Sequence, residues 1–327
     1  MCQVLSIGII AYNEEVFLPN LLEDMKAQKY PHDLIEILLI DSCSTDGTKA
    51  IMKRFQQENT DFYGIQVLEN PRRSQPAGWN VAITHFKGDV LARIDAHTKV
   101  SPEYSVYAME DIQSGEMVVG GIRPAVIDKN TPWTNVLLQV EKSLFGSSIN
   151  PSRRSTDRTY IKTMFHAAYR REVFEKVGLF NETLLRTEDN EFHYRVRQAG
   201  YRLCYDPRIE SFQFARGDFK QMVRQKYSNG YWIGRTIKVC PRCISIYHLI
   251  PFTFVCAILA TTCLSFCGIW QPGMMMWVAY GLFAVANTLI SGVSCGFYPQ
   301  HIIMPGLFLI LHTAYGVGTL LGIAKRS

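Results

Sequence analysis

Short apolar runs alternate with amphipathic stretches through the first third of the chain. The apolar runs are continuous, which is typical of strands buried on both faces, and apolar residues between them recur at helical spacing. The strand candidates are 4–10, 35–40, 65–68 and 90–94, and the helix candidates are 16–27, 48–57 and 77–86. Alternating strands and helices predict a parallel sheet covered on both faces, which is a doubly wound α/β domain.

The last third of the chain has a different pattern. It contains three apolar stretches, Ile244–Trp270, Met274–Cys295 and His301–Ala324. Each has about the 20 residues that a helix needs to cross a bilayer. A buried helical core would show a polar face on each helix, and no such face is visible here. The pattern predicts a C-terminal all-α transmembrane region.

Basic residues gather just before the first apolar stretch and account for most of the net charge of +5. They are Arg224, Lys226, Arg235, Lys238 and Arg242. The positive-inside rule then places the polar part of the chain in the cytosol and the tail in the plasma membrane. Anionic lipid explains this charge, so no nucleic-acid partner is expected.

The number of membrane crossings stays open. Lys325 and Arg326 follow the last apolar stretch, and three full crossings would put them outside the cell. One stretch could be re-entrant, so two to three spans are expected.

The segment 212–243 mixes aromatic and basic residues at helical spacing. Tyr231 and Trp232 lie among arginines and lysines, a pattern typical of an interfacial helix on an anionic membrane. Docking onto the domain's own core is the alternative. The expected domains are therefore 1–211, a globular domain, 212–243, an interfacial segment, and 244–327, the transmembrane helices.

Polar residues follow each predicted strand, where ligands bind in open α/β sheets. Neither GxGxxG nor GxxxxGK[ST] occurs after a strand, which argues against a dinucleotide oxidoreductase and a P-loop NTPase. Asp41, at the end of the second strand, could accept hydrogen bonds from a ribose or a base. Its alternative role is that of a turn residue, because turn formers surround it.

Asp95 and His97 follow the fourth strand. Residues two apart in an extended chain point to the same side. A carboxylate and an imidazole together could bind a divalent ion and leave positions open for phosphate oxygens and water. Such an ion would neutralise a diphosphate leaving group. In the alternative, Asp95 caps the following turn and His97 has no function.

Glu188 and Asp189 open a predicted helix over 188–198. Acidic residues in a first helical turn are often only partners of the helix dipole. One of them could instead be a general base for an acceptor hydroxyl.

Six segments together resemble family 2 glycosyltransferases of the GT-A fold. They are Ala11–Glu15, Ile40–Thr48, Ala77–Ala82, Ala92–His97, Tyr169–Gly178 and Thr187–Asp189. The Asp-Ala-His form at 95–97 is similar to the membrane-anchored branch that acts in succinoglycan biosynthesis. The resemblance implies a GT-A, nucleotide-diphospho-sugar transferase fold with a doubly wound mixed sheet, followed by the interfacial helix and the membrane region.

The resemblance also implies roles for individual residues. The nucleotide-sugar site would comprise Tyr12, Asn13, Glu14, Asp41, Asn70, Arg73, Gly78, Arg93 and Asp95. Asp95 matches the first Asp of the family's DxD element and His97 stands where the last Asp usually does, so the cation is expected to be Mn²⁺ or Mg²⁺. Asp189 becomes the expected general base, with Glu188 beside it.

The resulting hypothesis is an inverting, metal-dependent transfer of a sugar from a nucleotide-diphosphate donor to a lipid-linked saccharide in surface or exopolysaccharide biosynthesis. One alternative transfers the sugar to polyprenyl phosphate, which is already ionised and makes Asp189 less necessary as a base. Another is a non-catalytic membrane protein that binds sugar nucleotides. The loop 146–162 and its neighbourhood are expected to meet the acceptor. The residues concerned are Arg153, Arg154, Arg158 and His166.

Overall fold

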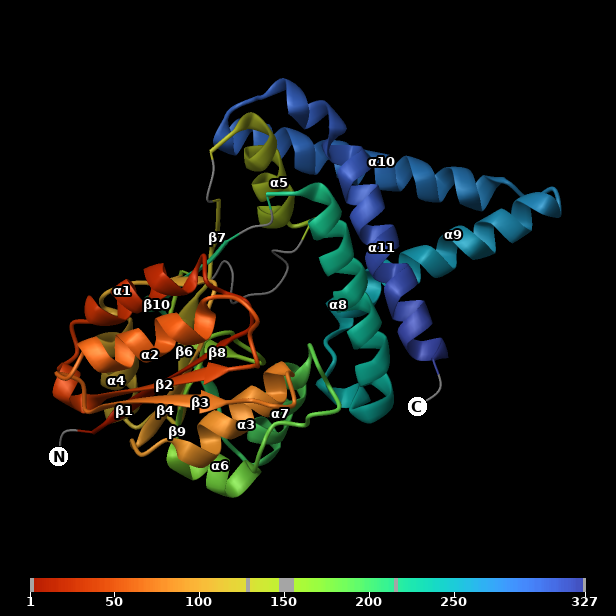
Figure 1. The fold of residues 1–327 in the computed structure, drawn as a ribbon. Coiled ribbons are helices and arrows are strands. Elements are labelled where there is room, and N and C mark those ends of the chain that lie inside the picture. Colours follow the sequence, from red (N-terminus) through yellow and green to blue (C-terminus); the bar gives the residue numbers. More distant parts are fainter. Residues whose placement is uncertain (1–2, 128–129, 147–155, 215–216, 326–327) are drawn as a thin grey trace. The chain divides into compact units, whose positions relative to one another are not determined.

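The computed structural model describes residues 3–127, 130–146, 156–214 and 217–325 (Figure 1). The chain forms two compact units. The first comprises Met1–Pro124 and Pro151–Gln213, and the second comprises Ala125–Asn150 and Phe214–Ser327.

The first unit is built on a mixed sheet with the strand order β3-β2-β1-β4-β9-β6-β10-β5. Its strands are β1 Leu5–Ala11, β2 Ile35–Asp41, β3 Gly64–Glu69, β4 Val90–Asp95, β5 Thr98–Val100, β6 Val118–Ile122, β8 Thr159–Ile161, β9 Ala168–Arg170 and β10 Leu203–Phe214. The four strands predicted from apolar runs are confirmed, and they pair in parallel. Strand β9 runs antiparallel between β4 and β6, which makes the sheet mixed, as the GT-A resemblance implied.

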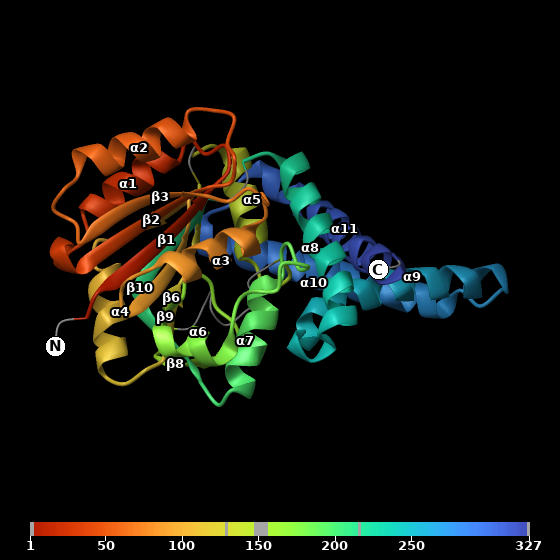
Figure 2. The same cartoon turned by 60° about the horizontal axis from the view of Figure 1, so that its bottom comes forward.

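Helices cover both faces of this sheet, with α1 and α2 on one side and α3 on the other (Figure 2). The helices are α1 Leu18–Lys26, α2 Thr48–Glu58, α3 Gln75–His85, α4 Tyr104–Gln113, α6 Arg171–Val177 and α7 Glu188–Gln198. The predicted helices over 16–27, 48–57, 77–86 and 188–198 are confirmed to within a few residues.

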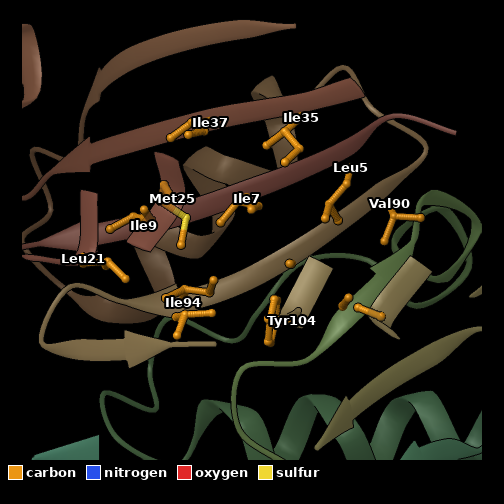
Figure 3. Close-up of a cluster of buried hydrophobic side chains, with 14 of the residues drawn as sticks. Leu5, Ile7, Ile9, Leu21, Met25, Ile35, Ile37, Val90, Ile94 and Tyr104 are labelled. Atoms are coloured by element: carbon orange, nitrogen blue, oxygen red, sulfur yellow. The ribbon is translucent and has the colours of Figure 1, made fainter. Parts of the chain in front are cut away.

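Alternating side chains along the strands fill two apolar clusters. Ile7 of β1 and Ile37 of β2 pack with Leu21 of α1 on one face (Figure 3). Leu38 and Ile40 of β2 point the other way, into a cluster with side chains of α3 and α7. Burying an Ile or Leu side chain contributes about 1.5–3 kcal/mol, so both layers hold the strands in place.

The parallel register brings the carboxyl ends of the strands to one edge of the sheet. Ala11 pairs with Asp41, and Asp41 pairs with Glu69. Asp95 pairs with Ile10 on the other side of β1. The loops that begin after these strands therefore start side by side at one edge, which we call the carboxyl edge.

The second unit is helical. It contains α5 Pro132–Lys142, α8 Phe219–Val239, α9 Ile250–Phe266, α10 Gln271–Cys295 and α11 Met304–Ala324. The expected domain bounds stay a prediction, and Ala125–Asn150, expected within the domain 1–211, group with this unit. The physical reason is the apolar side of α5, where Val136 and Val140 are buried in one cluster with Met304 and Phe308 of α11.

Three helices in the described part of the chain are long and apolar enough to cross a membrane. They span Ile246–Phe266, Gln271–Ser294 and Pro299–Ala324, close to the stretches expected from the sequence. The segment 212–243, expected to lie at the membrane interface, contains α8.

Glycines let α8 and α11 approach to backbone contact. A Cβ added to Gly318 of α11 would lie 2.3 Å from the carbonyl oxygen of Tyr227 in α8, and one added to Gly230 would lie 1.9 Å from that of Tyr315. Small residues that allow such close approach are typical of helix pairs in membrane proteins.

We expect Gly318→Ala to destabilise the second unit by about 1–3 kcal/mol, because the added methyl group forces the two helices apart. The measurement is the thermal unfolding temperature of the detergent-solubilised full chain. Gly306→Ala is the matched control, since Gly306 lies in the same helix and a Cβ there meets nothing within 4 Å. Equal unfolding temperatures for the two variants would contradict the close-packing account.

Candidate active site

The loops after β1 and β2 hold each other at the carboxyl edge. Asn13 Oδ1 accepts a hydrogen bond from the Thr45 amide at 2.8 Å, and the Asn13 amide donates to Ser44 Oγ at 3.0 Å. Asp41 Oδ1 accepts from the Ser44 amide at 3.0 Å. Asp41 is thus a turn residue, the alternative that the sequence left open, and it also lies at the expected edge. Tyr12 is 52% exposed and its ring is available to a ligand.

Asn70, at the end of β3, is almost fully buried. Its amide nitrogen donates to Ser42 Oγ at 3.0 Å and to the Ser74 carbonyl at 2.8 Å. Its Oδ1 has no hydrogen-bond partner among the described residues. A buried polar atom without a partner costs about 1–3 kcal/mol, so Asn70 Oδ1 is a candidate acceptor for a ligand group.

Gly78 serves a packing role in α3. A Cβ at this position would lie 2.8 Å from Ile10 Cδ1 and 3.2 Å from Asn70 Nδ2. The absence of a side chain therefore lets α3 pack against β1 close to Asn70.

Non-glycine residues with left-handed backbone lie near the carboxyl edge. Among the described residues, the non-glycine residues with positive φ are Asn13 at 56°, Cys43 at 59°, Arg73 at 55° and His166 at 45°. Three of them lie in the loops after β1, β2 and β3, and His166 contacts Asp95. Left-handed backbone is unfavourable for residues with a side chain and is concentrated at functional sites in proteins.

Asp95, the last residue of β4, has side-chain contacts to three other residues of the site. Its Oδ2 accepts from Arg123 Nη2 at 3.1 Å and lies 3.2 Å from His166 Nε2, and its Oδ1 accepts from Gln75 Nε2 at 3.3 Å. Burial opposes ionisation, but the hydrogen bond from His166 and the charge of Arg123 hold the pKa of Asp95 well below its usual range. Asp95 is therefore an anion at neutral pH.

His166 is a buried neutral partner of Asp95. Burial and the charge of Arg123 lower the pKa of His166 to about 4, so the ring is uncharged at neutral pH. Its Nδ1 lies 2.8 Å from Ser211 Oγ. A neutral ring that donates from Nε2 to Asp95 and accepts at Nδ1 from Ser211 satisfies both contacts.

His97 lies in the two-residue turn that joins β4 to β5. Its Nδ1 lies 3.2 Å from Glu14 Oε1, which leaves Nε2 as the ring nitrogen that a cation could bind. The described residues contain no group of three or more His, Cys, Asp or Glu side chains that could hold a metal ion. Asp95 and His97 fit a divalent cation only as a two-ligand set, with phosphate oxygens and water completing the shell, which is the arrangement expected of a site that binds metal with its substrate.

Arg93 lies on the same strand and is held between two aromatic rings. Its guanidinium carbon lies 4.5 Å from the ring centre of Trp79 and 4.6 Å from that of Phe180. Its Nη2 donates to Glu188 Oε1 at 3.3 Å, and both side chains are buried. A desolvated cation stacked on aromatic faces and paired with a carboxylate is rigidly placed.

Glu188 and Asp189 differ in exposure, and this difference separates their roles. Glu188 is buried against Arg93, whereas Asp189 is half-buried. Burial raises the pKa of Glu188, and the charge of Asp189 raises it further. Burial also raises the pKa of Asp189, while the charge of Arg93 lowers it. Asp189 is the carboxylate that a substrate hydroxyl could reach.

The structure brings His166 to the expected site but does not bring Arg158 there. Arg158 Nη2 pairs with Asp111 at 3.1 Å and Glu116 at 3.4 Å, at the amino end of β6. Arg153 and Arg154 lie outside the described residues. Arg73 is exposed in the loop before α3.

Sequence reasoning missed Gln75, Trp79 and Phe180. Gln75 lies just before the segment Ala77–Ala82 and Trp79 lies within it, so the resemblance indicated this region without singling out either residue. No sequence pattern indicated Phe180, because its ring contacts Arg93 only in the folded structure.

The family model for glycosyl transferase family 2 matches residues 6–178, more than half of the chain. The matched segment contains β1 to β4, Asp95 and His97. The chain therefore belongs to glycosyl transferase family 2, and it is a glycosyltransferase with a GT-A fold.

Two curated relatives are similar over long segments. The dolichyl N-acetyl-alpha-D-glucosaminyl phosphate 3-beta-D-2,3-diacetamido-2,3-dideoxy-beta-D-glucuronosyltransferase of Methanococcus voltae is 24% identical over 98% of this chain and 97% of its own length. The succinoglycan biosynthesis protein ExoA of Rhizobium meliloti is 27% identical over 70% of this chain and 68% of its own.

A solved structure supports the fold. The mannosyltransferase PcManGT from Pyrobaculum calidifontis, in complex with GDP-Man and Mn²⁺, superposes with a TM-score of 0.63. It covers 98% of this chain and 88% of its own, at 18% identity.

Proposed function

We propose that the protein is an inverting, metal-dependent glycosyltransferase that moves one sugar from a nucleotide-diphosphate donor to a lipid-linked saccharide. The observation that carries this function is the half-buried Asp189 carboxylate beside the buried Arg93–Glu188 pair. These groups lie within electrostatic reach of Asp95, whose charge raises the pKa values of both Glu188 and Asp189. A base and an anionic ligand for the donor thus share one edge of the sheet.

The chemistry is a single displacement at the anomeric carbon. An acceptor hydroxyl oxygen forms the new bond to that carbon, and its proton goes to Asp189. The bond from the anomeric carbon to the diphosphate oxygen breaks, and the nucleoside diphosphate leaves with the electron pair. Attack from the side opposite the leaving group inverts the anomeric configuration.

The nucleotide half of the donor is proposed to bind over the loops after β1, β2 and β3. The exposed Tyr12 ring offers a stacking surface, Asp41 and Asn70 supply acceptors, and Arg73 supplies a charge for phosphate. A divalent cation, Mn²⁺ or Mg²⁺, would be held by Asp95 and His97 and would offset the charge that develops on the diphosphate.

The lipid-linked saccharide acceptor is supported by the name of the Methanococcus relative, which acts on a dolichyl-linked N-acetylglucosaminyl phosphate and matches nearly the whole of both chains. The apolar helices of the second unit support a place in the plasma membrane, and the basic residues of α8 support a cytosolic catalytic unit by the positive-inside rule. Assembly of a surface polysaccharide is the proposed setting.

Membranes containing the full chain, incubated with a panel of labelled nucleotide sugars, test this function. We expect one donor to label a lipid-extractable product, and EDTA to abolish the labelling until Mn²⁺ or Mg²⁺ is restored. Membranes without the protein give the background. Transfer that continues in EDTA would contradict the proposed metal dependence. A product that carries the sugar directly on phosphate would contradict a saccharide hydroxyl as the acceptor.

A further inference from the structure

The three apolar helices of the second unit differ in how much of their surface is covered. In the most apolar window of each, 6% of the residues are buried for Ile246–Phe266, 11% for Gln271–Ser294 and 39% for Pro299–Ala324. Helices α9 and α10 therefore leave most of their side chains open, although Val255 of α9 and Ala284 of α10 are buried against α11. Helix α11 is covered to a much greater extent.

Helix α11 is covered along both halves. In the first half, Leu307, Phe308 and Leu311 pack on α5. His312 Nε2 lies 2.6 Å from the carbonyl oxygen of Phe145, and His301, just before the helix, lies 2.5 Å from Gln139 Oε1. These are polar contacts to a segment that carries charges.

The second half of α11 runs parallel to α8. Gly230 faces Tyr315 and Gly234 faces Thr319, so contact positions advance in the same direction along both helices. At their carboxyl ends, Lys238 Nζ donates to the Lys325 carbonyl at 2.7 Å, and Arg235 Nη1 donates to the same oxygen at 3.1 Å. Basic side chains on the last carbonyls of a helix stabilise its end.

The charges of α8 argue against a bilayer crossing by this pair of helices. Helix α8 carries Lys220, Arg224, Lys226, Arg235 and Lys238. Lys226 is buried and pairs with Glu141 at 2.9 Å. A Lys or Arg at the bilayer centre costs about 2.5–3.5 kcal/mol or more, and a crossing by α11 would draw several of these residues in with it.

We propose that α9 and α10 alone enter the lipid, as a helical hairpin that crosses the bilayer twice. Helix α11 stays with α8 on the cytosolic side, although its composition is that of a membrane span. This proposal rests on the membrane attachment in the function proposed above. It reconciles the basic residue Lys325 with the positive-inside rule, because an even number of crossings returns it to the side of the catalytic unit.

The tip of the hairpin suits the far interface. Residues 267–270 join α9 to α10 (Figure 2) and carry no charge, so the tip can pass through the lipid. Trp270 is 55% exposed, and tryptophan is enriched at the boundary between lipid and water. Cys267 is an exposed thiol at the same tip.

Two sidedness measurements on the full chain in bacterial cells test the proposal. The first fuses either a fluorescent protein or alkaline phosphatase after residue 327. We expect fluorescence and no phosphatase activity, because phosphatase needs disulfides that form only outside the cytosol. Active phosphatase would mean three crossings and would overturn the placement of α11.

The second measurement labels intact cells with a membrane-impermeant maleimide. We expect labelling of the wild-type chain and its loss in Cys267→Ser, since the other cysteines lie in lipid or inside the cell. An unlabelled wild-type tip in a chain that fractionates with membranes would overturn the double crossing. A chain found in the soluble fraction would instead contradict the membrane attachment itself.

Discussion

Replacing Asp189 by Asn is expected to slow sugar transfer by about 10²–10⁴-fold, the usual contribution of a general base. The amide keeps the shape of the side chain and cannot take the proton of the acceptor hydroxyl. Donor affinity should stay nearly constant, because the proposed nucleotide contacts come from the loops after β1, β2 and β3. The measurement is kcat with the labelled donor, alongside the dissociation constant of the nucleoside diphosphate.

Asp33→Asn is the matched control for this substitution. Asp33 is exposed and lies before β2, at the end of the strand opposite Asp41, so its replacement should leave kcat unchanged. Wild-type kcat in Asp189→Asn would show that another group takes the proton, or that the acceptor is already ionised.

Replacing Arg93 by Met should have the largest effect on stability. Removing one member of a buried ion pair typically costs about 3–5 kcal/mol, and here it also leaves the space between Trp79 and Phe180 without its cation. The double variant Arg93→Met with Glu188→Gln should regain part of that stability, because no buried carboxyl is left without its partner. The measurement is the unfolding free energy of the two variants.

The pH dependence of the Arg93 variant separates electrostatics from packing. The charge of Arg93 lowers the pKa values of Glu188 and Asp189, so its loss raises both. The acid limb of kcat, which reports ionisation of the base, should therefore move to higher pH. The contribution of these two carboxyls to stability should be greatest at low pH, where they are protonated in both states, and should be lost as pH rises through their raised folded-state pKa values. An unmoved acid limb would show that Arg93 acts only through packing.

The sequence predicted the parallel half of the sheet because its signal is local. The apolar runs of β1, β2 and β4 are continuous, and each is followed by polar residues at a fixed edge. Strand β9 has only three residues, Ala168–Arg170, which is too short for any periodicity. Its position between β4 and β6 depends on pairing across a long stretch of chain.

Part of the site could also be predicted because its sequence signal is local. Asp95, His97 and Asp189 stand in motifs that the sequence displays directly. The partner of Arg93 is Glu188, which is 95 residues away, and only folding joins the two. The apolar side of α5 does not indicate which partner it will meet, so the place of α5 beside α11 could not be predicted from the sequence.

The most direct test of the central claim is an NMR spectrum of the lipid product made from the active donor. The proposed mechanism predicts an anomeric configuration opposite to that of the donor and no coupling between the anomeric proton and phosphorus. Retained configuration would contradict the single displacement with Asp189 as base. A phosphorus coupling at the anomeric proton would contradict transfer to a saccharide hydroxyl.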